Sequence, residues 1–218
     1  STLAYTSHEK SGFFYPSVGF SLIFNKLMTL PQWVSLAKIR GAYSMVGNDI
    51  PMFITNPSSH ITAGGEFLAS DAAPFKDMEP EMTHSFEAGI EARFLKNRIG
   101  LNATFYKTNT RNQFFKLPTL SGDKYAYRYV NAGDIQNVGW EISLDAVPLL
   151  TNHFKWKTEV NFSTNRNKII SLHEALKEFL YGPTSFSSSY AMKLVKGGSI
   201  GDIYGKAFVD RKSTRLNS

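Results

Sequence analysis

The sequence predicts an all-β protein that forms an incomplete set of antiparallel strands from a β-barrel spanning a membrane. Side chains alternate between apolar and polar over several runs, which is the period of a strand lying between two different media. Each run is about as long as the ~9–11 residues that a tilted strand needs to cross a bilayer. The connections between runs alternate between short and long, as in outer-membrane barrels with short turns at one rim and long loops at the other.

The clearest runs form a hairpin between Thr83 and Tyr106. The even positions from Phe86 to Phe94 are all apolar, whereas the odd positions include Glu87, Glu91 and Arg93. A short polar turn follows, and the second run again places apolar residues on alternate positions. Two such runs joined by a tight turn predict a β-hairpin with one apolar and one polar face.

Four further runs flank this hairpin and bring the expected number of strands to six: Gly12–Phe24, Leu36–Val46, Val138–Ala146 and Phe154–Ser163. Pro16 is expected at the beginning of the first strand, because proline cannot donate a ladder hydrogen bond. One helical turn is expected before Pro31, and a short amphipathic helix around Ile169–Leu180. The connections Gly47–Pro80 and Lys107–Gln136 are long and polar, and neither shows a sustained period.

Aromatic residues are expected at the two membrane surfaces. Trp33, Trp156 and Phe94 fall beside the short turns, and Trp140 falls beside a long loop. Bands of Trp and other aromatic residues at these positions are typical of membrane barrels. A soluble β-sandwich or lipocalin-like barrel is the alternative that alternation alone leaves open.

Composition excludes several kinds of chemistry. The chain has no cysteine, so it cannot form a disulfide, a thiolate metal site or a cysteine nucleophile. Its five histidines lack the clustering of metal ligands. Glu87 and Glu91 would lie roughly 13 Å apart on one strand, beyond the ~5–9.5 Å of paired glycosidase carboxylates. The sequence therefore predicts no enzyme activity, no cofactor and no nucleic-acid partner, and part of the formal charge of +6 belongs to the last eight residues.

Two groups of residues are candidate sites. Charged side chains on the polar faces are expected to look into the barrel lumen, where solvation or pairing is the simpler role and substrate contact the alternative: Lys38, Arg40, Glu87, Glu91, Arg93, Glu141 and Asp145, with Lys155, Lys157 and Glu159 in the last run. Aromatic residues of the second long connection are candidates for contact with substrate or a partner: Phe114, Phe115, Tyr125, Tyr127 and Tyr129. Flat exposed rings stack on sugars, although such rings also form a loop's own core.

Several stretches resemble one family in the same order along the chain. The run from Pro80 to Gly89 (PEMTHSFEAG), followed by Phe94 to Leu101 (FLKNRIGL), resembles the signature of SusC/RagA-type TonB-dependent outer-membrane transporters of the Bacteroidetes. Further matches are Tyr15–Gly19, Lys38–Asn48, Tyr106–Gln113, Asn131–Glu141, Asn161–Ile170 and Gly198–Gly205. The resemblance covers about residues 13 to 208.

The resemblance implies a 22-stranded barrel in the outer membrane of a Gram-negative bacterium, filled by an N-terminal plug. Such a transporter imports oligosaccharides or peptides with energy from the TonB complex, under a lid formed by a SusD-like surface lipoprotein. Residues 1–210 would then be part of the barrel, without the plug and the segment that contacts TonB. Residues 211–218 (RKSTRLNS) do not continue the family pattern and are expected to be non-native. A passive porin-like barrel and a soluble β-domain that binds carbohydrate are the alternatives.

Overall fold

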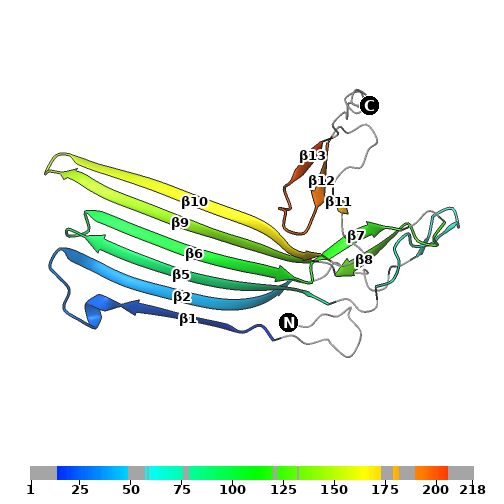
Figure 1. Cartoon of the computed structure of the whole chain (residues 1–218), viewed down its shortest axis with the longest axis horizontal. Coiled ribbons are helices and arrows are strands. Elements are labelled where there is room, and N and C mark those ends of the chain that lie inside the picture. Colours follow the sequence, from blue (N-terminus) through cyan, green and yellow to red (C-terminus); the bar gives the residue numbers. More distant parts are fainter. Residues whose placement is uncertain are drawn as a thin grey trace, which may run out of the picture.

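A computed structural model describes residues 14–48, 57, 59–75, 79–119, 122–131, 133–172, 179–181 and 190–205. Its main feature is one antiparallel sheet of six strands in the order β1–β2–β5–β6–β9–β10 (Figure 1). The strands are β1 (Ser17–Ile23), β2 (Val34–Asn48), β5 (Glu81–Phe94), β6 (Ile99–Arg111), β9 (Gly133–Leu150) and β10 (Lys155–Leu172). The predicted all-β, antiparallel fold is confirmed. Among the described residues, no helix is both long and apolar enough to cross a membrane.

The connections alternate in length as predicted (Figure 1). At one end of the sheet the chain turns within 24–33, 95–98 and 151–154, and the first of these turns contains the short 3-10 helix η1 (Phe24–Lys26) before Pro31. The tightest turn uses left-handed backbone at Leu95, Lys96 and Asn97, with φ of 51°, 56° and 65°. The longer connections, 49–80 and 112–132, both leave from the opposite end.

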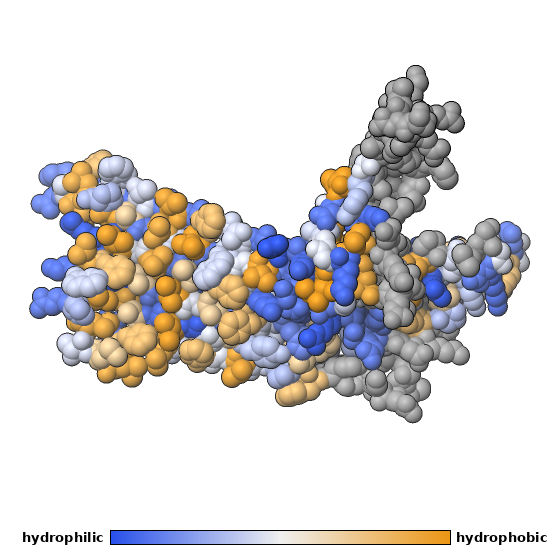
Figure 2. Space-filling view, in the orientation of Figure 1, coloured by the Kyte–Doolittle hydropathy of each residue, from blue (hydrophilic) through white to orange (hydrophobic). Residues whose placement is uncertain are grey.

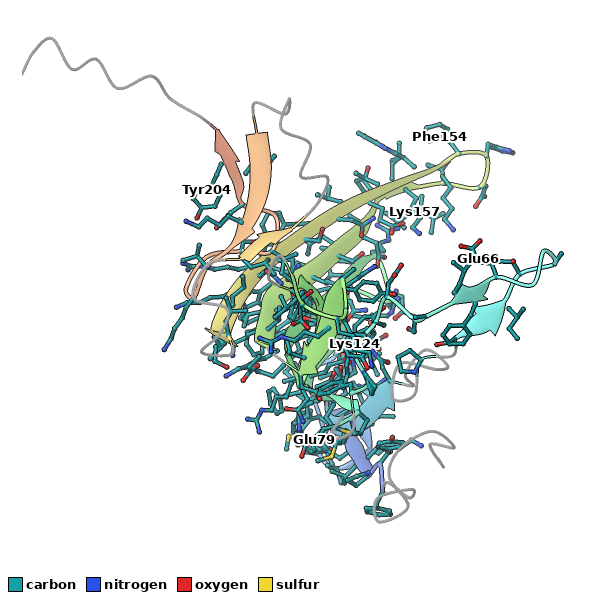
Figure 3. All side chains as sticks on the ribbon, turned by 90° about the vertical axis from the view of Figure 1, so that its right-hand side faces the viewer. Glu66, Glu79, Lys124, Phe154, Lys157 and Tyr204 are labelled. Carbon is teal, nitrogen blue, oxygen red and sulfur yellow. The ribbon has the colours of Figure 1, made fainter. Side chains whose placement is uncertain are left out.

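Smaller sheets lie at the end of the large sheet from which the long connections leave (Figure 1). The first long connection contains β3 (His60–Ile61) and β4 (Phe67–Leu68), and the second contains β7 (Phe114–Pro118) and β8 (Tyr127–Asn131). After β10, a three-stranded sheet is formed by β11 (Phe179–Tyr181), β12 (Tyr190–Leu194) and β13 (Ile203–Gly205). Seen from this end, Tyr204 of β13 and Glu66 of the β3–β4 turn stand well apart (Figure 3).

The large sheet has one apolar face that no second layer covers within the described part of the chain. The register aligns Ile39, Ile90, Ala103, Ile142 and Phe162 in one row across five strands. Large apolar side chains on this face are exposed, among them Phe20 (63%), Val160 (58%), Phe162 (58%) and Trp140 (48%). Figure 2 shows hydrophobic residues gathered over the half of the sheet near the short turns. A soluble sandwich would instead bury this face against another sheet.

Three expectations need correction or extension. The helix predicted around Ile169–Leu180 is wrong at both of its ends, because β10 continues to Leu172 and β11 begins at Phe179, while 173–178 lie outside the described residues. β9 and β10 extend well beyond the predicted ranges, and a bulge between Ile169 and Ser171 lets the pairing continue. The second long connection is not irregular but contains the β7–β8 hairpin.

Pro16 directly precedes β1 as predicted, and its carbonyl accepts a hydrogen bond from the Met45 amide at 2.9 Å. Residues 211–218 lie outside the described residues.

Candidate functional site

The second face of the large sheet is polar, and it collects the charged residues singled out in the sequence. Directly paired residues of an antiparallel ladder point to the same face. The register pairs Lys38 with Glu91, and it aligns Arg93 with Asp145 through Gly100. The seven residues Lys38, Arg40, Glu87, Glu91, Arg93, Glu141 and Asp145 therefore share the face opposite the exposed apolar one.

Four of these charges form a chain of ion pairs near the short turns. Lys38 Nζ lies 3.4 Å from Glu91 Oε2, and Arg93 Nε lies 3.9 Å from the other oxygen of Glu91. Arg93 Nη1 also lies 3.8 Å from Asp145 Oδ2, on a strand two positions away. All four side chains are part-exposed, so each pair contributes at most about 1 kcal/mol. The chain of pairs nevertheless ties β2, β5 and β9 together on this face.

Arg40 crosses a whole strand to reach its partners. It leaves β2, passes over β5, and donates from Nη2 to Thr104 Oγ1 at 2.6 Å and to Asn102 Oδ1 at 3.2 Å on β6. Its path lies over Gly89, where a Cβ atom would stand only 2.9 Å from Arg40 Nε. The Asp145 carboxylate lies over Gly100 in the same way. Glycine within a strand permits this close approach.

Two carboxylates on the polar face, those of Glu87 and Glu141, make no ion pair among the described residues. Glu141 lies with Arg40 and Ser143 at a hollow of about 330 Å³, which is also lined by Asn102, Thr104 and Asn161. Such a surface offers hydrogen bonds to water, to a polar solute or to another protein segment. In the described ranges, no three His, Asp or Glu side chains group closely enough to hold a metal ion.

The aromatic candidates divide between the two faces of the β7–β8 hairpin. Phe114, Tyr127 and Tyr129 come together: the rings of Phe114 and Tyr129 are 6.2 Å apart, and those of Tyr127 and Tyr129 are 5.7 Å apart, both edge to face. Lys116 Nζ lies 3.6 Å from the centre of the Tyr127 ring. Edge-to-face pairs and a cation over a ring are both favourable arrangements of aromatic groups.

Phe115 and Tyr125 do not join this group. Phe115 points to the other face of the hairpin, where it packs with Val130 and Leu172 around the buried Leu117. It therefore forms part of the loop's own core, which is the alternative role considered for these residues. Tyr125 precedes β8 and lies against Lys124, whose Nζ is 5.4 Å from the ring centre. We use "aromatic triad" below for Phe114, Tyr127 and Tyr129.

Burial affects the acidity of one member of the aromatic triad. The pKa of Tyr129 is raised from its ordinary value, first by burial of the hydroxyl and then by the nearby Tyr127. A raised pKa keeps the phenol protonated and available as a hydrogen-bond donor through neutral and mildly alkaline pH.

A hydrogen-bond clamp at the base of this hairpin was missed in the sequence. The Asn131 side chain accepts from the Glu79 amide at 2.9 Å and donates to the carbonyls of Glu79 (2.8 Å) and Asn112 (2.6 Å). The Asn112 side chain donates to Glu79 Oε2 at 2.8 Å. Asn112 has φ of 57°, a left-handed conformation that asparagine tolerates better than most residues. The clamp joins the start of β5 to both ends of the hairpin, and its members lie too far apart in sequence for a local motif to reveal it.

Known proteins share both the sequence pattern and the fold. A family model described as "TonB dependent receptor-like, beta-barrel" matches residues 2–190. TonB-dependent receptor P39 of Formosa agariphila is 24% identical over 202 residues, which cover 88% of this chain and 18% of the relative. TonB-dependent receptor SusC of Bacteroides thetaiotaomicron is 29% identical over 135 residues, covering 58% of this chain and 13% of the relative.

Solved structures of the RagAB peptide importer have the same fold. The structure in the open-open state superposes with a TM-score of 0.73 at 20% identity, over 90% of this chain and 21% of that chain. The closed-closed state gives the same TM-score at 18% identity, over 88% of this chain and 22% of that chain. The chain spans less than a fifth of the length of the curated relatives it matches. Its ordered motifs, its family-model match and its six-stranded antiparallel sheet show that the chain belongs to the TonB-dependent receptor β-barrel family.

Proposed function

We propose that this chain forms part of the barrel wall of an outer-membrane transporter, with its apolar face against lipid and its polar face toward the lumen. The observation that carries the proposal is the sheet with two unlike faces, one with exposed Phe20, Val160 and Phe162, and the other with the Lys38–Glu91–Arg93–Asp145 chain of ion pairs. An uncovered apolar face of this size is costly in water but favourable against hydrocarbon.

The whole protein, on this proposal, imports oligosaccharides or peptides across the outer membrane of a Gram-negative bacterium. Energy comes from the TonB complex, acting through parts of the protein outside this chain, and a SusD-like surface lipoprotein closes the extracellular side. Membership of the TonB-dependent receptor family supports the energy source, and the likeness in fold to the RagAB peptide importer supports peptides as one cargo class.

The aromatic triad is the proposed contact for cargo or for the lipoprotein lid. It lies on the hairpin that extends from the long-connection end of the sheet, which the proposal places outside the cell (Figure 1). Its rings are half-buried, so one side of the cluster is held by neighbours while the other remains accessible. Such a surface suits stacking on sugar rings or packing on apolar side chains. The polar-face residues are proposed to be hydrated in the lumen or to contact the plug.

Uptake measurements on the full-length protein test this function. Cells that carry it as their transporter should accumulate labelled oligosaccharides or oligopeptides only when TonB is present. Uptake that persists without TonB would favour a passive porin-like barrel and contradict the proposal. Replacing the triad (Phe114→Ala, Tyr127→Ala, Tyr129→Ala) should raise the cargo concentration for half-maximal uptake. Phe154→Ala removes an exposed ring at the opposite end of the sheet and should leave uptake unchanged.

A further inference from the structure

The apolar face gives way to polar and charged residues toward the long connections, over about one row of side chains on β6, β9 and β10. Along β6 the residues on this face are Ile99, Leu101, Ala103 and Phe105, and the next is Lys107. The neighbouring strands change within about one row of this level: the last large apolar residue of this face is Phe162 on β10, before Thr164, and Val138 on β9, before Gln136, whereas β5 still carries Phe86 beside Lys107. The register aligns Phe105 with Trp140 and Thr164, and one step further it aligns Lys107 with Val138 and Arg166. Hydrophilic residues accordingly cover this end of the sheet in Figure 2.

Three cations gather on this face just past the apolar rows. Lys107, Arg166 and Lys168 are all exposed, and none makes an ion pair with another described residue. Lys107 and Arg166 are separated by two strand spacings, ~10 Å between backbones, and Arg166 and Lys168 by ~7 Å along one strand. These side chains are long enough to converge on one group that lies between them.

The closest carboxylate on this face, that of Asp134, already has other partners. Asp134 pairs with Arg111 at 3.7 Å and accepts a hydrogen bond from the Asn109 amide at 3.0 Å. Gln136 lies between Asn109 and Lys168 in the register and donates to Asn109 at 3.1 Å. The three cations therefore border neutral amides rather than carboxylates, which leaves a local excess of positive charge.

Aromatic rings lie immediately on the apolar side of these cations. Trp140 is 48% exposed, and its ring centre lies 5.1 Å from that of Phe105. Exposed Trp on the outer surface of a membrane barrel marks the boundary between hydrocarbon and headgroups. A residue one row beyond this boundary stands at the level of the headgroups.

We propose that Lys107, Arg166 and Lys168 form a binding site for the phosphate of an outer-leaflet lipid of the lipid A class, whose acyl chains lie on the apolar rows below. The inference rests on the proposed placement in the outer membrane. Charge complementarity selects a phosphorylated headgroup, because arginine binds phosphate through two parallel hydrogen bonds and lysine adds point charge. Continuity of the three cations with the exposed apolar face selects a lipid rather than a free anion.

Lipid binding to the full-length protein, purified in detergent, tests the site. Native mass spectrometry would titrate diphosphorylated lipid A and the same lipid with its phosphates removed. The variant Lys107→Gln/Arg166→Gln/Lys168→Gln should bind diphosphorylated lipid A at least about tenfold more weakly than the parent, since each cation near an anionic headgroup contributes separately. The control Lys96→Gln/Arg98→Gln/Lys155→Gln removes the same charge at the opposite rim and should bind as the parent does.

Three results would overturn the inference: equal affinity of the parent and the triple variant, equal affinity of the parent for both lipids, or displacement of the lipid by inorganic phosphate alone. If the triple variant does not reach the outer membrane, Arg166→Gln alone carries the test and should weaken binding about threefold or more. Absence of the parent protein from the outer-membrane fraction would instead reject the proposed function. Normal uptake by a parent that binds lipid no better than the triple variant would reject only this site.

Discussion

An arginine introduced on the apolar face should have a different effect from one introduced on the polar face. Two neighbouring residues of β9 allow this comparison. Ile142 lies on the apolar face between Ala103 and Phe162, whereas Ser143 lies on the polar face between Asn102 and Asn161. Ile142→Arg and Ser143→Arg therefore introduce the same side chain at adjacent positions that point in opposite directions. In the full-length protein we expect the first to be strongly destabilising and the second to be mild.

The expected size follows from the depth of Ile142. On β6 the apolar face runs from Ile99 to the first cation, Lys107, a rise of ~26 Å at ~3.3 Å per residue. A strand tilt of ~40° reduces this to ~20 Å along the membrane normal, close to the ~25 Å apolar band of such barrels. Ala103 stands midway between Ile99 and Lys107 and pairs with Ile142. An arginine at 142 is therefore close to the midplane, where it costs ~2–4 kcal/mol.

An arginine at 143 meets a different environment. Ser143 lines the polar hollow beside Glu141, whose carboxylate makes no ion pair among the described residues, so the new charge gains a nearby opposite one. The change should stay within ~0.5 kcal/mol, as at most surface positions, because Ser143 is only half-buried. Unfolding of the full-length protein from lipid vesicles in guanidinium, followed by tryptophan fluorescence, gives both free energies. Equal losses at the two positions would refute the assignment of the faces.

Four further outcomes are expected. Gly139→Ala should cost ~1–3 kcal/mol in the same assay, because its Cβ would overlap a backbone carbonyl and a tyrosine ring, whereas Gly19→Ala meets only ordinary contacts from 3.5 Å and should be tolerated. Asn131→Ala should open the hairpin clamp, which faster amide exchange across 112–131 would report while the stability of the barrel changes little. Because the pKa of Tyr129 is raised in the folded hairpin, its phenol keeps its proton at a pH where the unfolded phenol has lost it. Hairpin stability should therefore fall as pH rises above about 10, and Tyr129→Phe should weaken that dependence in amide-exchange profiles. The isolated chain should aggregate in buffer without a cooperative melt, because the described residues leave the edge strands β1 and β10 and the apolar face of the sheet uncovered.

Sequence periodicity predicted the strands where the two faces meet unlike surroundings, and failed where they do not. β5 and β6 alternate clearly because one face is apolar and the other charged. In β10 the residues Asn165, Arg166, Asn167 and Lys168 are polar on both faces, yet their pairing with β9 continues without a break. Where both faces contact polar surroundings, pairing needs no alternation, so the ends of β9 and β10 left no period to detect.

The wrong helix has a related cause. The apolar residues Ile169, Ile170 and Leu172 have a spacing that a helix and an irregular strand can both produce. The bulge between Ile169 and Ser171 shifts the register at this point. Ile169 is completely buried, and its backbone exchanges hydrogen bonds of 2.8 Å with Gly197 and Gly198. This long-range pairing, which no local window contains, decides the conformation.

The candidate sites were predictable as residue types but not as groupings. Adjacent residues of a strand point to opposite faces, so Phe114 and Phe115 separate as soon as β7 is recognised as a strand. The meeting of Phe114 with Tyr129 depends on the β7–β8 register, which the polar intervening turn does not specify. The reach of Arg40 to β6 likewise depends on Gly89 standing directly opposite it.

Glycines explain how a single-layer sheet packs its side chains. In four places a glycine stands directly opposite a long side chain that folds over it: Phe20 over Gly41, Arg40 over Gly89, Asp145 over Gly100 and Tyr106 over Gly139. A layered domain packs side chains against an opposing layer, but among the described residues this sheet has none, and its side chains pack sideways instead. The glycines leave room for that sideways packing on the apolar face as well as the polar one. A substitution at these glycines, of which Gly89, Gly100 and Gly139 are themselves buried, therefore disrupts packing between strands, and it should be as damaging as a core substitution is in a layered fold.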